Sequence, residues 1–386
     1  MTDRKTLFEV TREHLDTGMR GIPVGTCKTS SVDPETGVHY VGIPVGELVH
    51  LEPEEVLFLL LEKRLPNNEE SRKLKQELVS HSKVPTILHT VLREIAGHVH
   101  PMKALSVAIE LAIQDDEKKD TRSQVLAINA RAPWILASII RIRSGQDVAE
   151  TEFIEDGIVE SFVKALNPNE NLSRSIMTRI LKTFYILHLD HGGGNLSTFT
   201  GKAVSSGKAD VSASLSASMN ALSGPLHGRA NQSCLEFVQR VGTDDPKEVE
   251  KFVRSEIAAG RPIYGFGHAV LRKEDPRATI QISVGQELCP EHPLFKTVCT
   301  LREVASKILA ENPKIKNPNP NVDLVSGTLL QAAGLIDVET YTGFFGWARL
   351  GGIGAQILDE RNARNGKGVP IYRPKFIHTS VSNQSS

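Results

Sequence analysis

The stretch GPLHGRAN, residues 224–231, interrupts a chain that otherwise carries one helical pattern after another. Gly and Pro end the preceding helix, and an apolar pattern with helical spacing resumes at Leu235, Val238 and Val241. His227 is therefore expected near the start of a helix, where partial positive charge favours a neutral imidazole that can donate a hydrogen bond. The competing interpretation is an ordinary turn that contains a surface histidine.

Helical spacing of apolar residues continues through most of the chain after Pro53. Helices are predicted over 54–64, 67–81, 84–99, 101–113, 121–143, 158–166, 176–187, 197–206, 211–222, 235–241, 246–259, 276–288, 293–311, 323–333 and 338–362. The many Ser and Ala residues of 197–222 indicate that two of these helices approach closely. Strand pattern is confined to the first 50 residues, around a turn at 33–37. The predicted class is all-α, with a short β-hairpin near the N-terminus.

Composition excludes several classes of protein. The chain has 386 residues, enough for about two or three domains. A formal net charge of −1 argues against a surface dedicated to nucleic acid or to an anionic membrane. Four cysteines without a CxxC pair favour neither a disulfide framework nor a metal site. The first residues show no secretory or transit signal, and no run of about 18 apolar residues occurs, so we expect a cytoplasmic protein without a membrane span.

Three motifs suggest chemistry that the rest of the chain does not support. His188 and His191 have the spacing of a metal site on one helix face, but no third ligand accompanies them, and His188 is interpreted as a core residue. The glycines at 192–194 suit an esterase oxyanion loop, yet no Gly-x-Ser-x-Gly nucleophile occurs. Residues 265–267, GFG, lack the third glycine and the βαβ setting of a dinucleotide site. No metal is therefore expected.

The remaining candidates are two histidines and one aspartate in Gly-, Pro- or Asn-rich breaks between helices, and two arginines that come later in the chain. They are His227, His268, Asp323, Arg349 and Arg373. A carboxylate base beside neutral histidine donors suits proton abstraction next to a carbonyl, and arginines suit an anionic substrate.

Three segments of the chain resemble the signature segments of the citrate synthase family, in particular its mitochondrial, si-type branch. They are GPLHGRANQ at 224–232, GFGHAVLRKEDPRA at 265–278 and NPNPNVD at 317–323. The similarity extends from GMRG at 18–21 through LHLDHGGGN at 187–195 to RPK at 373–375. It implies a two-domain helical homodimer that condenses acetyl-CoA with oxaloacetate and water to give citrate and CoA, without a metal or other cofactor.

The resemblance also implies roles for individual residues. Asp323 would remove a methyl proton from acetyl-CoA, His227 would stabilise the enolate, and His268 would polarise the oxaloacetate carbonyl and protonate the alkoxide. The dicarboxylate would be held by four side chains, the last from the partner subunit: His191, Arg277, Arg349 and Arg373. Asn195 would support the histidines. The CoA contacts would be Arg20, Gly228, Arg272, Lys316, Asn321 and, from the partner subunit, Arg141.

The family also implies a domain division. The large domain would comprise 1–229 and, after the chain returns, 339–386 with the C-terminal tail, and a small mobile domain would span 230–338. Gly192 stands where the family usually has Glu, and 366–369 read as a short insertion before Arg373. The N-terminal extension of the hexameric, NADH-inhibited branch is missing, so a dimer without that regulation is expected.

Three alternatives remain open from the sequence. One is a 2-methylcitrate synthase that uses propanoyl-CoA, because one methylene is worth only about 1–3 kcal/mol of discrimination. The second is a citryl-CoA-cleaving lyase, since the family fold also serves that reverse chemistry. The third is a catalytically inactive helical scaffold, which the complete set of candidate catalytic residues disfavours.

Overall fold

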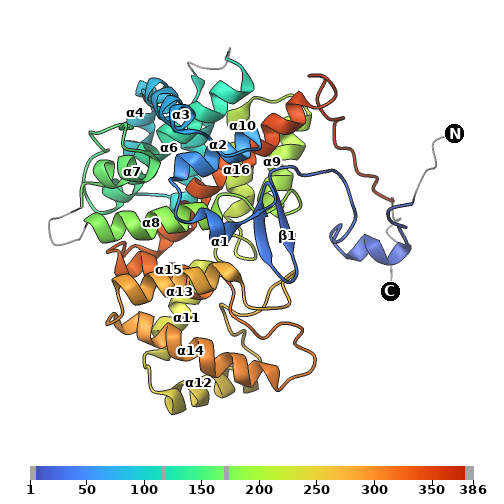
Figure 1. Ribbon diagram of the computed structural model, residues 1–386, viewed down its shortest axis with the longest axis vertical. Coiled ribbons are helices and arrows are strands. Elements are labelled where there is room, and N and C mark those ends of the chain that lie inside the picture. Colours follow the sequence, from blue (N-terminus) through green and yellow to red (C-terminus); the bar gives the residue numbers. More distant parts are fainter. Residues whose placement is uncertain (1–5, 115–118, 169–173, 379–386) are drawn as a thin grey trace, which may run out of the picture.

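Helices make up most of the computed structural model, which describes residues 6–114, 119–168 and 174–378 (Figure 1). The α-helices are α1 (Val45–Leu48), α2 (Pro53–Glu62), α3 (Asn68–His81), α4 (Thr86–Ile95), α5 (Pro101–Leu111), α6 (Thr121–Arg143), α7 (Ile158–Leu166), α8 (Arg174–His188), α9 (Leu196–Ser206), α10 (Val211–Leu222), α11 (Ala230–Val241), α12 (Pro246–Ala258), α13 (Pro276–Leu288), α14 (Pro293–Ala310), α15 (Asp323–Ala332) and α16 (Tyr341–Asn362). The described residues also include the 3₁₀ helices η1 (Arg12–Asp16) and η3 (Val338–Thr340). The predicted all-α class is confirmed. The end of the predicted tail, 379–386, lies outside the described residues.

A small antiparallel sheet follows the N-terminal segment. Strands β1 (Ser30–Asp33) and β2 (Gly37–Tyr40) form the predicted hairpin, with Val32 opposite Val38. The short strand β3 (Ile43–Pro44) adds a third member in the order β1-β2-β3. Tyr40 is fully buried, and its hydroxyl donates to the carbonyl of Ile186 at the end of α8. The sheet is thereby anchored beside the loop that follows α8.

The core lies between α6 and α16, which pack against each other and against α5, α7 and α10. Trp134 of α6 and Trp347 of α16 are among the largest fully buried side chains. By length and composition α6 could cross a membrane, but 83% of its most apolar 18-residue window is buried inside the protein. Such burial is that of a core helix.

Small residues allow α9 and α10 to approach closely, as the sequence predicts. A Cβ placed on Gly201 of α9 would lie 2.1 Å from the Oγ of Ser218 and 2.9 Å from the carbonyl oxygen of Ser214 on α10. Side chains larger than glycine would therefore push the two helices apart.

Helices α11 to α15 gather in one part of the molecule, which occupies the lower half of Figure 1. Within it, α11 packs on α15, and α12 packs on α14. The chain enters this part through the turn at 223–229 and leaves it through 333–340. Contacts of α13 and α15 with α8 join it to the rest of the protein. The small domain predicted for 230–338 would contain these five helices, and both this division and an independent movement of the two parts stay predictions.

Candidate active site

His191 lies in the loop between α8 and α9. Its backbone N–H donates to the carboxylate of buried Asp190 at 2.8 Å, and the side-chain amide of Asn195 donates to its carbonyl at 3.1 Å. Asn195 also caps α9, because its Oδ1 accepts the N–H of Thr198. Burial, followed by the charge of Arg277, lowers the pKa of His191 well below its usual range. The His191 ring is therefore neutral at physiological pH.

His227 lies in the tight turn between α10 and α11. Its Nε2 accepts the backbone N–H of Ser197 at 3.2 Å, so the proton of the neutral ring resides on Nδ1. Burial, and then the charge of Arg349, lowers the pKa of His227 to about 4. A Cβ at Gly228 would lie 2.2 Å from the carbonyl oxygen of Leu222, so this turn requires glycine. The His227 ring is therefore neutral at physiological pH, and burial is the principal cause.

His268 has the opposite tautomer. Its Nδ1 accepts the backbone N–H groups of Val270 and Leu271, each at 3.0 Å, so Nε2 carries the proton of the neutral ring. Burial lowers the pKa of His268, and Arg277 lowers it further. His268 is thus a second neutral donor, and its ring centroid lies 5.7 Å from that of His191.

Asn321 joins the segment before His268 to the segment that carries Asp323. Its backbone N–H donates to the carbonyl of Gly265, and its side-chain amide donates to the carbonyl of Gly267, both at 2.9 Å. Its Oδ1 in turn accepts the N–H of Asp323 at 3.0 Å. These bonds fix the backbone of Asp323 relative to that of His268.

Asp323 is the first residue of α15. Burial raises the pKa of its carboxyl group to about 6, although the charge of Arg277 opposes this increase. A carboxylate with this pKa is mostly ionised at pH 7 and is a stronger base than an exposed aspartate. Asp323 therefore has the properties of a general base.

Two buried arginines carry the positive charge of the site. The Nε and Nη2 groups of Arg277 donate to the carboxylate of Asp275, with the shortest distance at 2.7 Å. Arg349 donates from Nε to the carbonyl of His188 at 2.8 Å, and its guanidinium lies 4.7 Å from the ring centroid of Phe345. Burial lowers the pKa of Arg349 to about 10, so the group stays charged. Among the described residues, the other N–H groups of the two guanidinium groups have no hydrogen-bond partner, so they can bind an anionic ligand.

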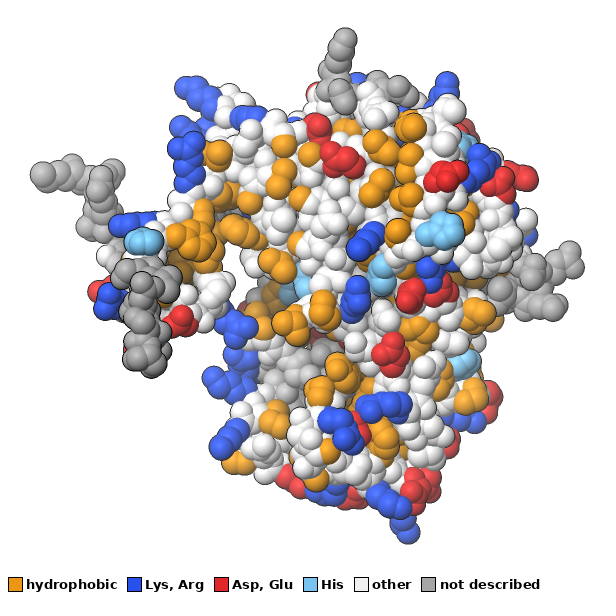
Figure 2. Space-filling model, turned by 180° about the vertical axis from the view of Figure 1, so that it is seen from behind, with side chains coloured by type: hydrophobic (Ala, Val, Ile, Leu, Met, Phe, Trp, Pro, Cys, Tyr) orange, Lys and Arg blue, Asp and Glu red, His pale blue; other side chains and the backbone are white. Residues whose placement is uncertain are grey.

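The charges of the two arginines influence the pKa values of the other candidate residues, which shows that these residues lie near one another. The charge of Arg277 acts on His191, His268 and Asp323. The charge of Arg349 acts on His191 and His227. On the face shown in Figure 2, a hollow lies between the two parts of the molecule, with histidine side chains at its edge and Lys and Arg side chains beside it. The predicted catalytic residues and three of the four predicted dicarboxylate ligands thus form one cluster.

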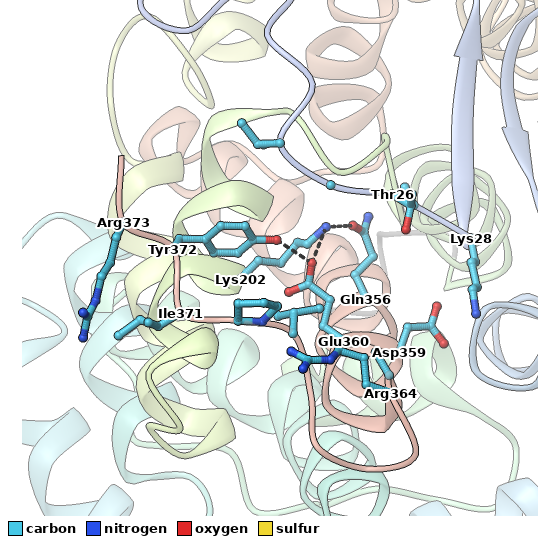
Figure 3. A pocket seen from close by; sticks show the side chains of 16 residues that line it. Thr26, Lys28, Lys202, Gln356, Asp359, Glu360, Arg364, Ile371, Tyr372 and Arg373 are labelled. Carbon is cyan, nitrogen blue, oxygen red and sulfur yellow. Dashed lines mark hydrogen bonds and ion pairs between the residues drawn. The ribbon is translucent and has the colours of Figure 1, made fainter. Parts of the chain in front are cut away.

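Several other predicted residues lie elsewhere in the described chain. Arg373 is exposed in the C-terminal tail and borders a cavity of about 560 Å³ beside Lys202 and Tyr372 (Figure 3). Arg141 lies in the last turn of α6, and its Nε donates to the carbonyl of Asp147. The exposed side chains of the predicted CoA site are Arg20, Lys316 and Arg272, and Arg272 is near enough to His268 for its charge to lower the pKa of that ring.

Four residues of the site were not among the sequence-predicted candidates. Asp275 neutralises Arg277, Phe345 covers Arg349, Asp190 holds the His191 loop, and Ser197 fixes the tautomer of His227. Of these four residues, only Asp275 lies in a local sequence pattern that predicts its structural role, because an aspartate directly before a proline is typical of the start of a helix.

Among the described residues, no group of three or more His, Cys, Asp or Glu side chains is placed to hold a metal ion. His188 is a core residue, as predicted. It is buried, its Nδ1 bonds to the carbonyl of Phe184, and its ring stacks on that of Phe184 at 4.1 Å between centroids. Its imidazole is therefore not available beside that of His191.

The chain is similar to known proteins along almost its whole length. The model of the citrate synthase family, C-terminal domain, matches residues 18–375. A mitochondrial 2-methylcitrate synthase of Yarrowia lipolytica is 34% identical, over 96% of this chain and 85% of that protein. A mitochondrial citrate synthase of Saccharomyces cerevisiae is 32% identical, over 97% of this chain and 83% of that protein. A citrate synthase of the archaeon Thermoplasma acidophilum, solved with carboxymethyl-CoA and oxaloacetate, has the same fold, with a TM-score of 0.83 at 22% identity over 96% and 97% of the two chains.

The chain belongs to the citrate synthase family. It is an enzyme that transfers an acyl group and forms citrate, which confirms the main functional prediction from the sequence. The roles of its individual residues, its oligomeric state and its location stay predictions.

Proposed function

We propose that this protein condenses acetyl-CoA with oxaloacetate through the side chains of Asp323, His227 and His268. The assignment is carried by the hydrogen bonds and the burial of the three groups. Asp323 is a carboxylate of raised pKa, and the two histidines are neutral donors whose protons lie on Nδ1 and Nε2, respectively. One base and two donors are what the reaction requires.

In the first step the Asp323 carboxylate takes a proton from the methyl group of acetyl-CoA. The charge that develops on the thioester oxygen is stabilised by the Nδ1–H of His227, because a thioester methyl group is too weak an acid to ionise without such help. The enolate carbon then attacks the ketone carbon of oxaloacetate, and the ketone oxygen takes the proton from Nε2 of His268. Water cleaves the resulting citryl-CoA to citrate and CoA.

Arg277, Arg349 and His191 would bind the oxaloacetate carboxylates. The two arginines are buried and charged, so a dicarboxylate replaces water around guanidinium groups that are already in position. The Thermoplasma acidophilum relative contains oxaloacetate and a CoA analogue together, which supports these two ligand classes for the present chain. Arg20, Arg272, Lys316, Gly228 and Asn321 would contact CoA.

We propose that the part formed by 230–338 closes over oxaloacetate before acetyl-CoA reacts. His268 and Asp323 belong to this part, whereas Arg349 and His191 belong to the other part. The reacting groups therefore come together across the boundary, and closure would exclude water from citryl-CoA.

The active form is proposed to be a homodimer, with Arg373 and Arg141 acting in the partner's site. Arg373 supports this proposal, because it is exposed on the tail instead of lying in the histidine cluster. The variants Asp323→Gly and Arg373→Leu should each be inactive alone, but an equal mixture under conditions of subunit exchange should recover about a quarter of the wild-type activity. About half of the dimers are then mixed, and one of the two sites in each mixed dimer is intact. No recovery despite exchange would contradict a shared site.

Acyl preference and location need separate experiments. Release of CoA should be measured with acetyl-CoA and with propanoyl-CoA at saturating oxaloacetate. We expect acetyl-CoA to have the higher kcat/KM; a preference for propanoyl-CoA would identify a 2-methylcitrate synthase, as in the Yarrowia lipolytica relative. The two relatives named above are mitochondrial, so we propose an organellar location as the alternative to the predicted cytoplasmic one. Fluorescence microscopy of the tagged protein would decide between the two locations.

A further inference from the structure

Helix α9 connects the histidine cluster to the C-terminal tail. At its start, Asn195 holds the His191 loop and Ser197 binds the ring of His227. Its first turn also contacts Tyr372 of the tail: the ring centroids of Phe199 and Tyr372 lie 5.7 Å apart. At its end, the Ser206 hydroxyl accepts the backbone N–H of Tyr372 at 3.1 Å.

A continuous chain of polar contacts runs beside this helix. The amide of Gln356 donates to Asp190 at 2.9 Å, and its oxygen accepts from Lys202 Nζ at 3.4 Å. The Lys202 ammonium lies 3.0 Å from the Glu360 carboxylate, which accepts the hydroxyl of Tyr372 at 2.8 Å. Figure 3 shows the part of this chain from Gln356 to Tyr372.

The ion pair in the middle of the chain is buried. The side chains of Lys202 and Glu360 are only 6% and 10% exposed. A Cβ at Gly193 would lie 3.0 Å from Lys202 Nζ, so the ammonium lies directly beneath the glycine loop. Because desolvation offsets most of the attraction within such a pair, stability alone does not account for it.

We propose that Lys202 and Glu360 are positioning residues that couple the dicarboxylate site at His191 to the tail that carries Arg373. This inference rests on the proposed function. One end of the polar chain is the Asp190 carboxylate, which fixes the His191 backbone, and the other end is the residue before Arg373. The tail also borders a cavity of about 560 Å³, which gives it space to move when its Tyr372 contacts are lost. Binding of oxaloacetate at one end therefore orders the other end, and the coupling acts in both directions.

The first test removes both charges, so that neither remains buried without its partner. In the double variant Lys202→Met/Glu360→Gln, we expect the KM for oxaloacetate to rise about tenfold, with kcat and the KM for acetyl-CoA within about twofold of wild type. The matched control is Arg254→Met/Glu311→Gln, which removes an exposed ion pair and should change none of these constants. An unchanged KM for oxaloacetate, or a parallel loss of all constants together with a lower melting temperature, would overturn the proposal.

The second test does not depend on turnover. Trypsin cleavage after Lys375 should be slowed several-fold by oxaloacetate in the wild-type protein but not in the double variant or in Tyr372→Phe, which removes one hydroxyl without stranding a charge. The single variant Lys202→Arg keeps the positive charge, so it should retain part of the protection by oxaloacetate that the double variant loses. Equal cleavage of the wild-type protein with and without oxaloacetate would overturn the coupling. Wild-type protection without any CoA release would refute the proposed function and leave the coupling intact.

Discussion

Acidification provides a direct test of the base assigned to Asp323. Burial raises the pKa of its carboxyl group to about 6, from an ordinary value of 3.8. Only the ionised form accepts a proton, so kcat/KM should fall about tenfold for each pH unit well below 6. At pH 5 about one tenth of the activity should remain, whereas a base with the ordinary pKa would retain more than about nine tenths.

His227 does not produce this acid limb. The pKa of His227 is about 4, so this ring stays neutral while Asp323 titrates. The profile should be recorded between pH 5 and 8 from the loss of thioester absorbance, with unfolding monitored in parallel by circular dichroism. Activity at pH 5 that stays near its value at pH 7, in a protein that stays folded, would refute the assignment of Asp323 as the titrating base.

Three further changes give distinct outcomes. Gly352→Ala should lower the free energy of unfolding, measured in urea, by about 1–3 kcal/mol, because the new Cβ would lie 2.1 Å from the carbonyl oxygen of Leu189. The control Gly194→Ala should change this free energy by less than about 0.5 kcal/mol, because its Cβ would have no atom within 4 Å. His227→Gln should lower kcat about 10²- to 10³-fold without affecting oxaloacetate binding by calorimetry, since it removes a donor for the enolate; a smaller loss would exclude that role. Asp323→Asn should raise the melting temperature at pH 8, where the wild-type protein bears the cost of a buried carboxylate, and this gain should vanish below about pH 4, where the carboxyl is protonated in both folded and unfolded states.

Much of the helical framework could be predicted from the sequence, because apolar spacing and helix caps are local signals. The predicted helices at 121–143 and 211–222 have the bounds of α6 and α10, whose caps are Asp120 and Asp210. The prediction of a helix over 84–99 was too long, since α4 ends at Ile95. Its continuation is a turn of 96–99 before Pro101 starts α5.

The catalytic candidates were also predictable, because each lies in a motif with a recognisable sequence. Their supporting contacts were not, since the partners are far apart along the chain. Asp190 bonds Thr29 across 161 residues and Gln356 across 166 residues. No local pattern indicates such pairs. The tautomers of His227 and His268 likewise depend on backbone N–H groups that only the folded structure places.

The central claim is that Asp323 removes the proton from acetyl-CoA, and one variant tests it most directly. Asp323→Gly should release no CoA above background from acetyl-CoA and oxaloacetate, while calorimetry shows oxaloacetate bound with nearly wild-type affinity, because the predicted ligands Arg277, Arg349 and His191 are unchanged. Sustained CoA release by this variant would contradict the account.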